Sequence, residues 1–447
     1  MRGKFRHFIG FKQSVKMVLL LTKLRRSGWF SLPAFLAAIF VLGLLLTFLH
    51  NRNYNRAQLD VNEVKKSELQ RGSRRDNINE PPTWNCTKQV TLLTPSMGPF
   101  KAWREYKLLQ HMFTSNIKND VPSFELSCPV QRCNLTIGAT LSDKRLLGNS
   151  NGVVINIAPN LLKNKLDATI KKLSNILCND VTWFFLGMES PQMFTYWDAQ
   201  IANIQYHNEI AYHSQSSLSI PYGYFVASKP MDNVPGKDWT KDKTHLIAWM
   251  ASNCENTFWP RSEFVYDLLN YIPVDMYGKC GNLSCLPPMS PECNNMLSKY
   301  KFYLALENTE CDEYITEKFW EKCMKHNVVP VVYGGRRAAY EKLAPPNSFI
   351  HVGDFATAEE LAQYLLALDR DDQKYNEFFQ WRLQGHVQTN YPPLNPDVFC
   401  EMIPLLSSET PKTKQKVSES KYFNSCRDKP TGLFAKSGSY SNWSSWK

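Results

Sequence analysis

The sequence predicts an α/β fold of two Rossmann-like domains that face a cleft, preceded by a transmembrane anchor helix and a stem. Three observations support this prediction. Short apolar runs alternate with segments of helical period from residue 84 to about residue 400. A loop rich in Pro and Lys at 229–243 divides them into two halves. An uncharged, apolar stretch at 29–49 comes before both.

The stretch at 29–49 is long enough to span a membrane, because a helix rises about 1.5 Å per residue and the hydrocarbon layer is about 30 Å thick. Residues 1–28 carry eight Lys and Arg and no Asp or Glu, which predicts a cytoplasmic tail and a luminal remainder. A cleaved signal peptide is the alternative, but it would need a shorter apolar stretch ending in small residues. Residues 50–83 are polar and aperiodic, which is typical of a stem.

The net charge of +11 first suggests an acidic partner such as nucleic acid. Eight of these charges lie in residues 1–28, so the rest of the chain carries only +3. We find neither a basic stripe nor a nucleic-acid-binding signature there, and therefore expect no nucleic-acid partner.

All 12 cysteines lie beyond the predicted anchor, between Cys86 and Cys426, which suits an oxidising compartment. Spacing alone would allow Cys280, Cys285 and Cys293 to bind zinc, but no spaced His accompanies them, so we expect disulfides. Four sequons are expected to carry N-glycans on the luminal side: Asn85, Asn134, Asn282 and Asn442.

The first domain is predicted to cover residues 84–235. Its apolar runs at 89–93, 135–139, 153–157 and 182–187 indicate strands, and 161–177 has the period of a helix. Continuous apolar runs joined by helices are typical of parallel sheets covered on both faces.

The second domain is predicted to cover residues 236–400, followed by a polar tail at 401–447. Strands are expected at 245–250, 274–277, 302–306, 328–333 and 349–352. Helices are expected at 262–271, 317–326 and 358–368.

The clearest candidate site lies in the second domain. The strand before 308 ends in Glu307 and Asn308, and a helix opens near Thr316. Ligands of open α/β sheets bind beyond the carboxyl ends of strands, and helix N-termini attract anions. Lys318 therefore suits a diphosphate, with Tyr314, Glu317 and Asn308 as further polar groups. The alternative is a solvated first helical turn with a surface Lys.

The same residues carry a family resemblance. The segments FYLALEN at 302–308 and DEYITEK at 312–318 closely resemble the donor-binding signature of α1,3/4-fucosyltransferases. AWMASN at 248–253, VDMYG at 274–278, VPVV at 329–332 and the run at 345–355 also resemble that family. MESP at 188–191 and PYG at 221–223 resemble its acceptor-side motifs. The resemblance is strong over residues 180–385 and thin over 84–180.

The resemblance implies a two-domain GT-B fold and inverting transfer of L-fucose from GDP-β-L-fucose to the 3-hydroxyl of GlcNAc in glycoprotein glycans. Glu189 matches the family's catalytic base, although a loop Glu is otherwise most often only solvated. Donor-binding positions are matched or suggested at Arg261, Tyr303, Glu307, Asn308, Tyr314, Glu317 and Lys318. Together with the anchor, it implies a type II Golgi membrane enzyme with a luminal catalytic domain.

No cofactor is expected beyond the donor substrate, with a divalent metal at most stimulating. The Asp-x-Asp pattern formed by Asp369 and Asp371 resembles a manganese motif, but we interpret it, with Asp372, as a solvated helix end. The alternatives for function are a catalytically silent glycan-binding relative and a transferase that uses another sugar nucleotide. Whether the acceptor is the N-glycan core or antennary N-acetyllactosamine stays open.

Overall fold

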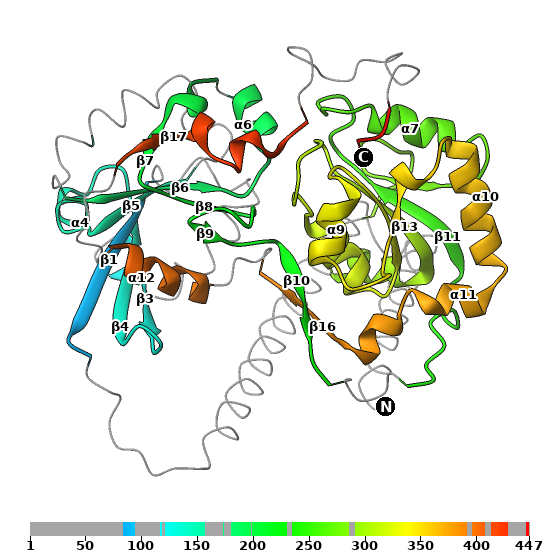
Figure 1. Ribbon diagram of the computed structural model, residues 1–447, viewed down its shortest axis with the longest axis horizontal. Helices are drawn as coiled ribbons and strands as arrows, with labels where there is room; N and C mark the ends of the chain where they lie inside the picture. Colours follow the sequence, from blue (N-terminus) through cyan, green and yellow to red (C-terminus); the bar gives the residue numbers. More distant parts are fainter. Residues whose placement is uncertain are drawn as a thin grey trace, which may run out of the picture. The chain divides into compact units, whose positions relative to one another are not determined.

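The computed structural model (Figure 1) describes residues 84–93, 117–118, 121–156, 173, 180–197, 199–229, 235–285, 291–390, 396–406, 413–427 and 444–446. These residues fall in one compact unit, Trp84–Lys447. The predicted anchor at 29–49, the tail and stem around it, the sequon at Asn442 and all but Leu173 of the predicted helix at 161–177 lie outside them. None of the described helices is both long and apolar enough to cross a membrane.

The first sheet has eight strands in the order β2-β3-β4-β1-β5-β6-β8-β9. Their bounds are β1 Cys86–Leu93, β2 Ile117–Lys118, β3 Val121–Cys128, β4 Cys133–Ala139, β5 Gly152–Asn156, β6 Thr182–Gly187, β8 Asn208–Ala211 and β9 Leu218–Ser219. The run from β4 through β1, β5, β6 and β8 to β9 is parallel, whereas β2 and β3 pair antiparallel at one edge. The four strands predicted in this half are confirmed; β2, β3, β8 and β9 were not predicted.

Strand β6 shows why the apolar runs belong to a central parallel strand. All six of its residues, TWFFLG, are buried. Its neighbours β5 and β8 pair with its two edges. Because side chains on both faces are buried, neither face of the strand meets solvent. A strand covered on both faces has a continuous apolar sequence rather than an alternating one.

The second sheet is wholly parallel, in the order β12-β11-β13-β14-β15. Its strands are β11 His245–Met250, β12 Asp275–Tyr277, β13 Tyr300–Leu306, β14 Val329–Tyr333 and β15 Ile350–His351. Numbered along the chain this is the order 2-1-3-4-5, a doubly wound arrangement in which the strand order reverses between β11 and β13. Each predicted strand of this half is confirmed, with ends shifted by at most two residues.

Helices cover both faces of this sheet. Along β13, Phe302, Leu304 and Leu306 pack in one apolar cluster with α7 (Arg261–Leu268) and α10 (Ala358–Asp369). Tyr303 and Ala305 point to the other face and join a cluster that includes Phe319, Trp320 and Tyr340. Alternate residues of a strand face opposite sides, so the continuous apolar run at 302–306 supplies both layers.

Two helices differ in detail from the sequence predictions. Helix α7 ends at Leu268, three residues before the predicted end. The helix predicted at 317–326 is a π-helix over Lys318–Met324. Its wider turns are seen where the Lys325 N–H donates to the Trp320 carbonyl, five residues back, at 3.3 Å. Such π-turns are frequent at functional sites.

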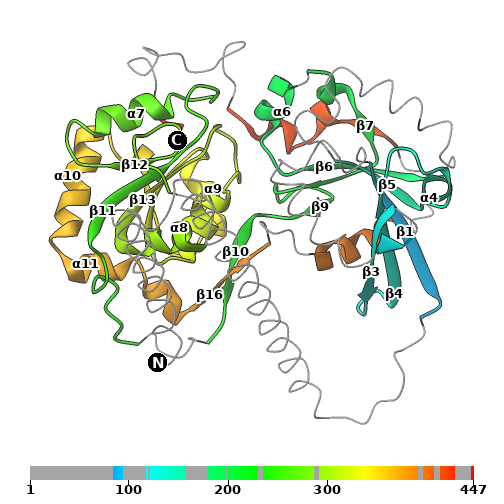
Figure 2. The same cartoon turned by 180° about the vertical axis from the view of Figure 1, so that it is seen from behind.

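The remaining elements link segments that are far apart in sequence. Strand β10 (Gly223–Ala227) pairs antiparallel with β16 (Gly385–Thr389), and β7 (Gln205–Tyr206) pairs with β17 (Gln415–Lys416) (Figures 1 and 2). Strand β17 lies in the segment 413–427, which belongs to the predicted polar tail. This part of the tail is therefore folded and pairs with a strand of the first half. Short helices α4 (Lys144–Gly148), α6 (Pro191–Trp197), α8 (Pro291–Met296), α9 (Arg337–Leu343), α11 (Asp372–Glu377) and α12 (Ile403–Leu406) complete the α-helices of the described residues.

Five disulfides are formed among the described residues: Cys86–Cys133, Cys128–Cys400, Cys254–Cys280, Cys285–Cys293 and Cys311–Cys426. The preference for disulfides over zinc at 280–293 is confirmed. Cys323 is buried and unpaired. No group of three or more His, Cys, Asp or Glu that could hold a metal ion occurs in the part of the chain that the structure describes.

Candidate active site

The reversal point of the second sheet fixes where its ligand site should be. A crevice opens beyond the carboxyl ends of the two strands at which the order reverses. Here these are β11 and β13, followed by Ala251 and Glu307 respectively. Helix α7, which connects β11 to β12, starts at Arg261 and so brings a guanidinium group to the same edge.

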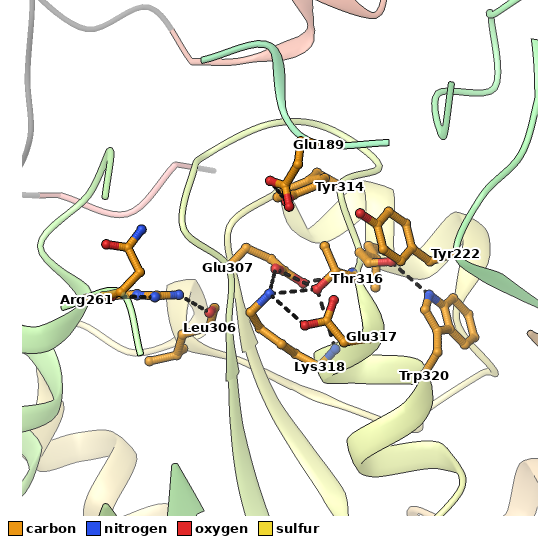
Figure 3. A network of polar contacts seen from close by, with 12 residues as sticks. Glu189, Tyr222, Arg261, Leu306, Glu307, Tyr314, Thr316, Glu317, Lys318 and Trp320 are labelled. Atoms are coloured by element: carbon orange, nitrogen blue, oxygen red, sulfur yellow. Dashed lines mark hydrogen bonds and ion pairs between the residues drawn. The ribbon is translucent and has the colours of Figure 1, made fainter. Parts of the chain in front are cut away.

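The Arg261 side chain is buried and held by main-chain carbonyls. Its two terminal nitrogens donate to the carbonyl oxygens of Leu306 at 3.0 Å and Asn253 at 2.7 Å (Figure 3). Burial lowers the pKa of Arg261, and the nearby Glu307 carboxylate opposes that shift. The Nε atom is buried and has no hydrogen-bond partner among the described residues. At least one donor of this fixed cation, the Nε–H, is therefore left over at this edge.

Glu307 forms the centre of a buried polar cluster directly after β13. One carboxylate oxygen accepts the Thr316 N–H at 2.8 Å, and the other accepts the Thr316 hydroxyl at 2.9 Å and the Lys318 ammonium at 2.7 Å (Figure 3). Only 1% of the Glu307 side chain is exposed, against 20% for Lys318. The cluster ties the loop after β13 to the start of the π-helix.

The charges of Glu307 and Lys318 each stabilise the ionised form of the other. Burial raises the pKa of Glu307, and Lys318 acts against that rise. For Lys318, burial alone would lower the pKa, but Glu307 and Glu317 outweigh it, so the pKa is raised. The Glu317 carboxylate lies 3.6 Å from the Lys318 ammonium. Lys318 therefore keeps its positive charge at neutral pH.

Asn308 and Tyr303 lie on or next to β13. The carbonyl of Asn308 accepts the Phe258 N–H at 2.7 Å, whereas its side-chain Oδ1 is buried and has no partner among the described residues. Tyr303 is buried, and burial raises its pKa. Buried polar atoms are nearly always hydrogen-bonded, so the Asn308 oxygen marks a place for a polar ligand or water.

Glu189 comes from the first sheet, two residues after β6, and is half-buried. Its carboxylate accepts the Tyr314 hydroxyl at 2.7 Å (Figure 3). Burial and the Glu189 charge raise the pKa of Tyr314, so Tyr314 stays protonated and donates. This hydrogen bond joins two residues that are 125 positions apart in the sequence, one from each predicted domain.

Two tyrosines that hold the Glu189 loop were not predicted. Tyr222 donates to the Met188 carbonyl and Tyr422 donates to the Glu189 carbonyl, both at 2.5 Å. Tyr222 lies in the PYG motif at 221–223, which pointed to the right segment but not to this contact. For Tyr422 the only signal was Cys426, a cysteine in an otherwise polar tail.

The structure thus brings Glu189, Tyr314, Glu307, Thr316, Glu317 and Lys318 together, with Arg261 beside the end of β13 (Figure 3). The residues of the Asp369–Asp372 pattern contact a different set of residues. Asp369 and Asp372 pair with Lys301, and the Asp371 side chain caps α11 by accepting the Lys374 N–H. Of the sequons, Asn85, Asn134 and Asn282 are exposed.

Comparison with known proteins identifies relatives of the second half. Residues 240–421 match the model of glycosyltransferase family 10 (fucosyltransferase), C-terminal region. Glycoprotein 3-alpha-L-fucosyltransferase A of Drosophila melanogaster is 38% identical over 183 residues, 40% of this chain and 36% of the relative. Human 4-galactosyl-N-acetylglucosaminide 3-alpha-L-fucosyltransferase FUT6 is 36% identical over 200 residues, 45% of this chain and 54% of the relative.

A solved structure, described as an alpha1,3-fucosyltransferase with GDP-fucose, aligns with 75% of this chain and 95% of its own. Its TM-score is 0.47 and its sequence identity 16%. The chain spans between about a third and about half of the length of the two curated relatives.

Proposed function

We propose, from the premise that residues 240–421 belong to glycosyltransferase family 10, that this chain is an α1,3-fucosyltransferase. It would transfer L-fucose from GDP-β-L-fucose to the 3-hydroxyl of GlcNAc in glycoprotein glycans, with inversion at the anomeric carbon. The names of the matched relatives support the transferred sugar and the linkage, since both are called 3-alpha-L-fucosyltransferases.

The observation that carries the proposal is the hydrogen bond between Glu189 and Tyr314. It sets the carboxylate proposed as the base against the loop proposed to bind the donor, at 2.7 Å. An inverting transfer needs these two groups close together, because the acceptor oxygen must lose its proton while it attacks the donor sugar.

In the proposed reaction, the GlcNAc 3-hydroxyl gives its proton to Glu189 and its oxygen attacks the anomeric carbon of fucose. The bond between that carbon and the diphosphate oxygen breaks on the opposite face, and GDP leaves with the electron pair. Arg261 and Lys318 would neutralise the charge that grows on the diphosphate. Both are buried or nearly so, which strengthens their electrostatic effect relative to water.

The donor contacts are proposed on the same physical grounds. The Arg261 Nε and Asn308 Oδ1 atoms lack partners among the described residues. The Nε–H can therefore donate to a phosphate oxygen, and Oδ1 can accept from a hydroxyl of the sugar or ribose, without first breaking a protein contact. Glu317, 3.6 Å from the Lys318 ammonium, is proposed to face the fucose and its developing positive charge. Tyr303 is proposed to line the same GDP-fucose site, in a GT-B arrangement with a cleft between the two sheets.

The test is transfer by the purified full-length chain in detergent. GDP-fucose is compared with GDP-mannose, which keeps the nucleotide and changes the sugar, on a panel of core and antennary GlcNAc glycans read by mass spectrometry. Addition of one deoxyhexose from GDP-fucose only is the expected result. Transfer from GDP-mannose alone would indicate the other-donor alternative. Glycan binding without transfer from either donor would indicate the silent relative.

We also propose a type II Golgi membrane location with a luminal catalytic domain, anchored by 29–49. Three of the sequons, Asn85, Asn134 and Asn282, are exposed and so accessible to glycosylation. Glycosidase treatment of the cellular protein should lower its apparent mass. Protease added to intact vesicles should cut only residues 1–28. Cleavage of the catalytic region in intact vesicles would mean that the orientation is wrong.

A further inference from the structure

Glu313, directly before Tyr314, has an unusual backbone conformation. Its φ is +59°, in the left-handed region. For a residue other than glycine this region costs roughly 1–2 kcal/mol, although Asn and Asp enter it more easily. Two of the other three described non-glycine residues with positive φ are Asn327 and Asn347. Glu313 therefore needs contacts that hold it in place.

Those contacts are made by its carboxylate. One oxygen accepts the Ser214 N–H at 2.6 Å, and the other accepts the Ser214 hydroxyl at 2.9 Å and the Lys342 ammonium at 2.5 Å. Lys342 also donates to the Ser214 hydroxyl at 2.6 Å. Three segments meet at this one buried carboxylate: the turn after β8, the loop after β13 and helix α9.

The Glu313 carboxylate is ionised at neutral pH, so its contacts with Lys342 and Ser214 persist there. Burial raises the pKa of Glu313, but the hydrogen bonds from Lys342 and Ser214 outweigh it, and the net pKa is lowered. His213 adds to the lowering, so the groups that face the carboxylate are Lys342, Ser214 and His213. Glu313 is therefore charged wherever the proposed enzyme would work.

The loop is fixed at both ends around Tyr314. Before it, Cys311 is disulfide-bonded to Cys426, and the Asp312 N–H donates to the Ser425 carbonyl at 2.9 Å. After it, Thr316 is held by Glu307. The direction of the Tyr314 side chain between these points depends on the backbone at 313. That side chain is buried, packs on Tyr212 with ring centres 5.1 Å apart, and reaches Glu189.

We propose that Glu313 is a positioning residue: its contacts with Ser214 and Lys342 hold the left-handed turn that directs the Tyr314 hydroxyl to Glu189. This inference rests on the proposed function, in which Glu189 is the base. A glycine would adopt the same φ at little cost but would leave the turn free to change. A charged side chain tied to two other segments fixes the turn and, through Tyr314, the orientation of the Glu189 carboxylate.

The test compares Glu313→Gln with Glu321→Gln in the full-length protein. Both changes remove a carboxylate that pairs with a lysine, but Glu321 pairs with Lys325 in an i,i+4 pair on the π-helix, outside the segment 311–317. Because a displacement of about 1 Å in an active site can cost about a hundredfold in rate, we expect Glu313→Gln to lower kcat roughly ten- to a hundredfold. The GDP affinity should stay within about threefold, because Arg261 and Lys318, which are proposed to hold the diphosphate, lie outside the turn. Glu321→Gln should match the wild type.

A double-mutant cycle separates positioning from a general loss of stability. If Glu313 acts through Tyr314, then Glu313→Gln should cause little further loss of kcat in the Tyr314→Phe background. The same fold-loss in both backgrounds, or an unchanged kcat for Glu313→Gln alone, would overturn the proposal. All rates are measured at a temperature where each variant is folded.

Amide hydrogen exchange over 311–317 gives a readout that does not depend on activity. Exchange should be faster in Glu313→Gln and unchanged in Glu321→Gln. Only Glu313→Gln removes the carboxylate that Ser214 and Lys342 hold. If the wild-type protein transfers no fucose, the proposed function fails, while exchange still decides whether Glu313 holds the turn. Equal exchange in all three proteins would overturn the proposal in either case.

Discussion

Glu189 and Glu307 occupy corresponding places in the two sheets. Each follows a buried strand within two residues of its end: every residue of β6 is buried, and every residue of β13 except Lys301. Glu307 is buried and both its oxygens accept hydrogen bonds, from Thr316 and the cationic Lys318. Glu189 is half-buried, and its carboxylate accepts a hydrogen bond from the neutral Tyr314 hydroxyl. A position at the end of a strand therefore makes a carboxylate available. Its neighbours determine whether it is held by a cation, as Glu307 is, or faces a neutral hydroxyl, as the proposed base Glu189 does.

Replacing Glu189 tests one side of this comparison and has the largest expected effect. Glu189→Gln keeps the shape of the side chain but cannot accept a proton at neutral pH. General-base assistance is worth about 10²–10⁴ in rate, so turnover should fall at least about a hundredfold. GDP affinity, measured by calorimetry, should stay within a few-fold. A variant that keeps more than about a tenth of the turnover would show that the base is another residue.

Replacing Glu307 tests the other side. Glu307→Gln leaves the Lys318 ammonium without its closest anion in a buried site. Breaking a buried ion pair by removing one partner costs about 3–5 kcal/mol. We expect a loss of stability near the lower end, because the amide oxygen still accepts one hydrogen bond, and urea unfolding would measure it. If Glu307→Gln were as stable as the wild type but as inactive as Glu189→Gln, the two roles would be reversed.

Lys318→Ala and Arg261→Ala test whether the cations near Glu307 bind the donor. A charge-assisted hydrogen bond contributes about 1.5–3 kcal/mol, so GDP affinity should fall roughly ten- to a hundredfold in each variant. Lys325→Ala, which removes an exposed lysine of the same region, is the matched control. Unchanged GDP binding in both variants would place the donor site elsewhere on the chain.

Chelation has the smallest expected effect. If Arg261 and Lys318 neutralise the diphosphate, transfer should survive saturating EDTA with at most a moderate decrease. Rates with and without EDTA, on the same enzyme sample, are the measurement. Complete loss that is restored by added metal would mean that these cations are not sufficient, and would return attention to Asp369, Asp371 and Asp372.

The second sheet could be predicted almost completely from sequence because its three inner strands, β11, β13 and β14, carry apolar runs. The run at 302–306 supplies two layers of core, and no polar residue interrupts it. In contrast, β3 reads VPSFELSC and alternates polar with apolar residues, as suits its antiparallel pairing with β4 near an edge. Such a strand depends on its partner, which the local sequence does not identify.

The candidate site could be predicted as a set of residues but not as a set of contacts. The motif at 312–318 identified Tyr314, Glu317 and Lys318, whereas the left-handed turn at Glu313 and its anchor on Ser214 depend on a residue 99 positions away. The π-helix was predicted as an ordinary helix, because i to i+5 hydrogen bonding leaves no distinct pattern in so short a segment. Tyr422 was missed since only the folded chain brings it to Glu189.

The disulfides determine what a single cut in the main chain does to the protein. The bridges Cys128–Cys400 and Cys311–Cys426 join cysteines that are 272 and 115 positions apart, and the two stretches of chain that they enclose overlap. A single break of the main chain between 312 and 399 would leave two pieces joined by both bridges, and the protein would keep its full mass until reduced. Deleting residues 426–447 is a different matter. It would leave Cys311 as an unpaired thiol in the loop that carries Tyr314, so Cys426 is part of the covalent framework that holds this loop.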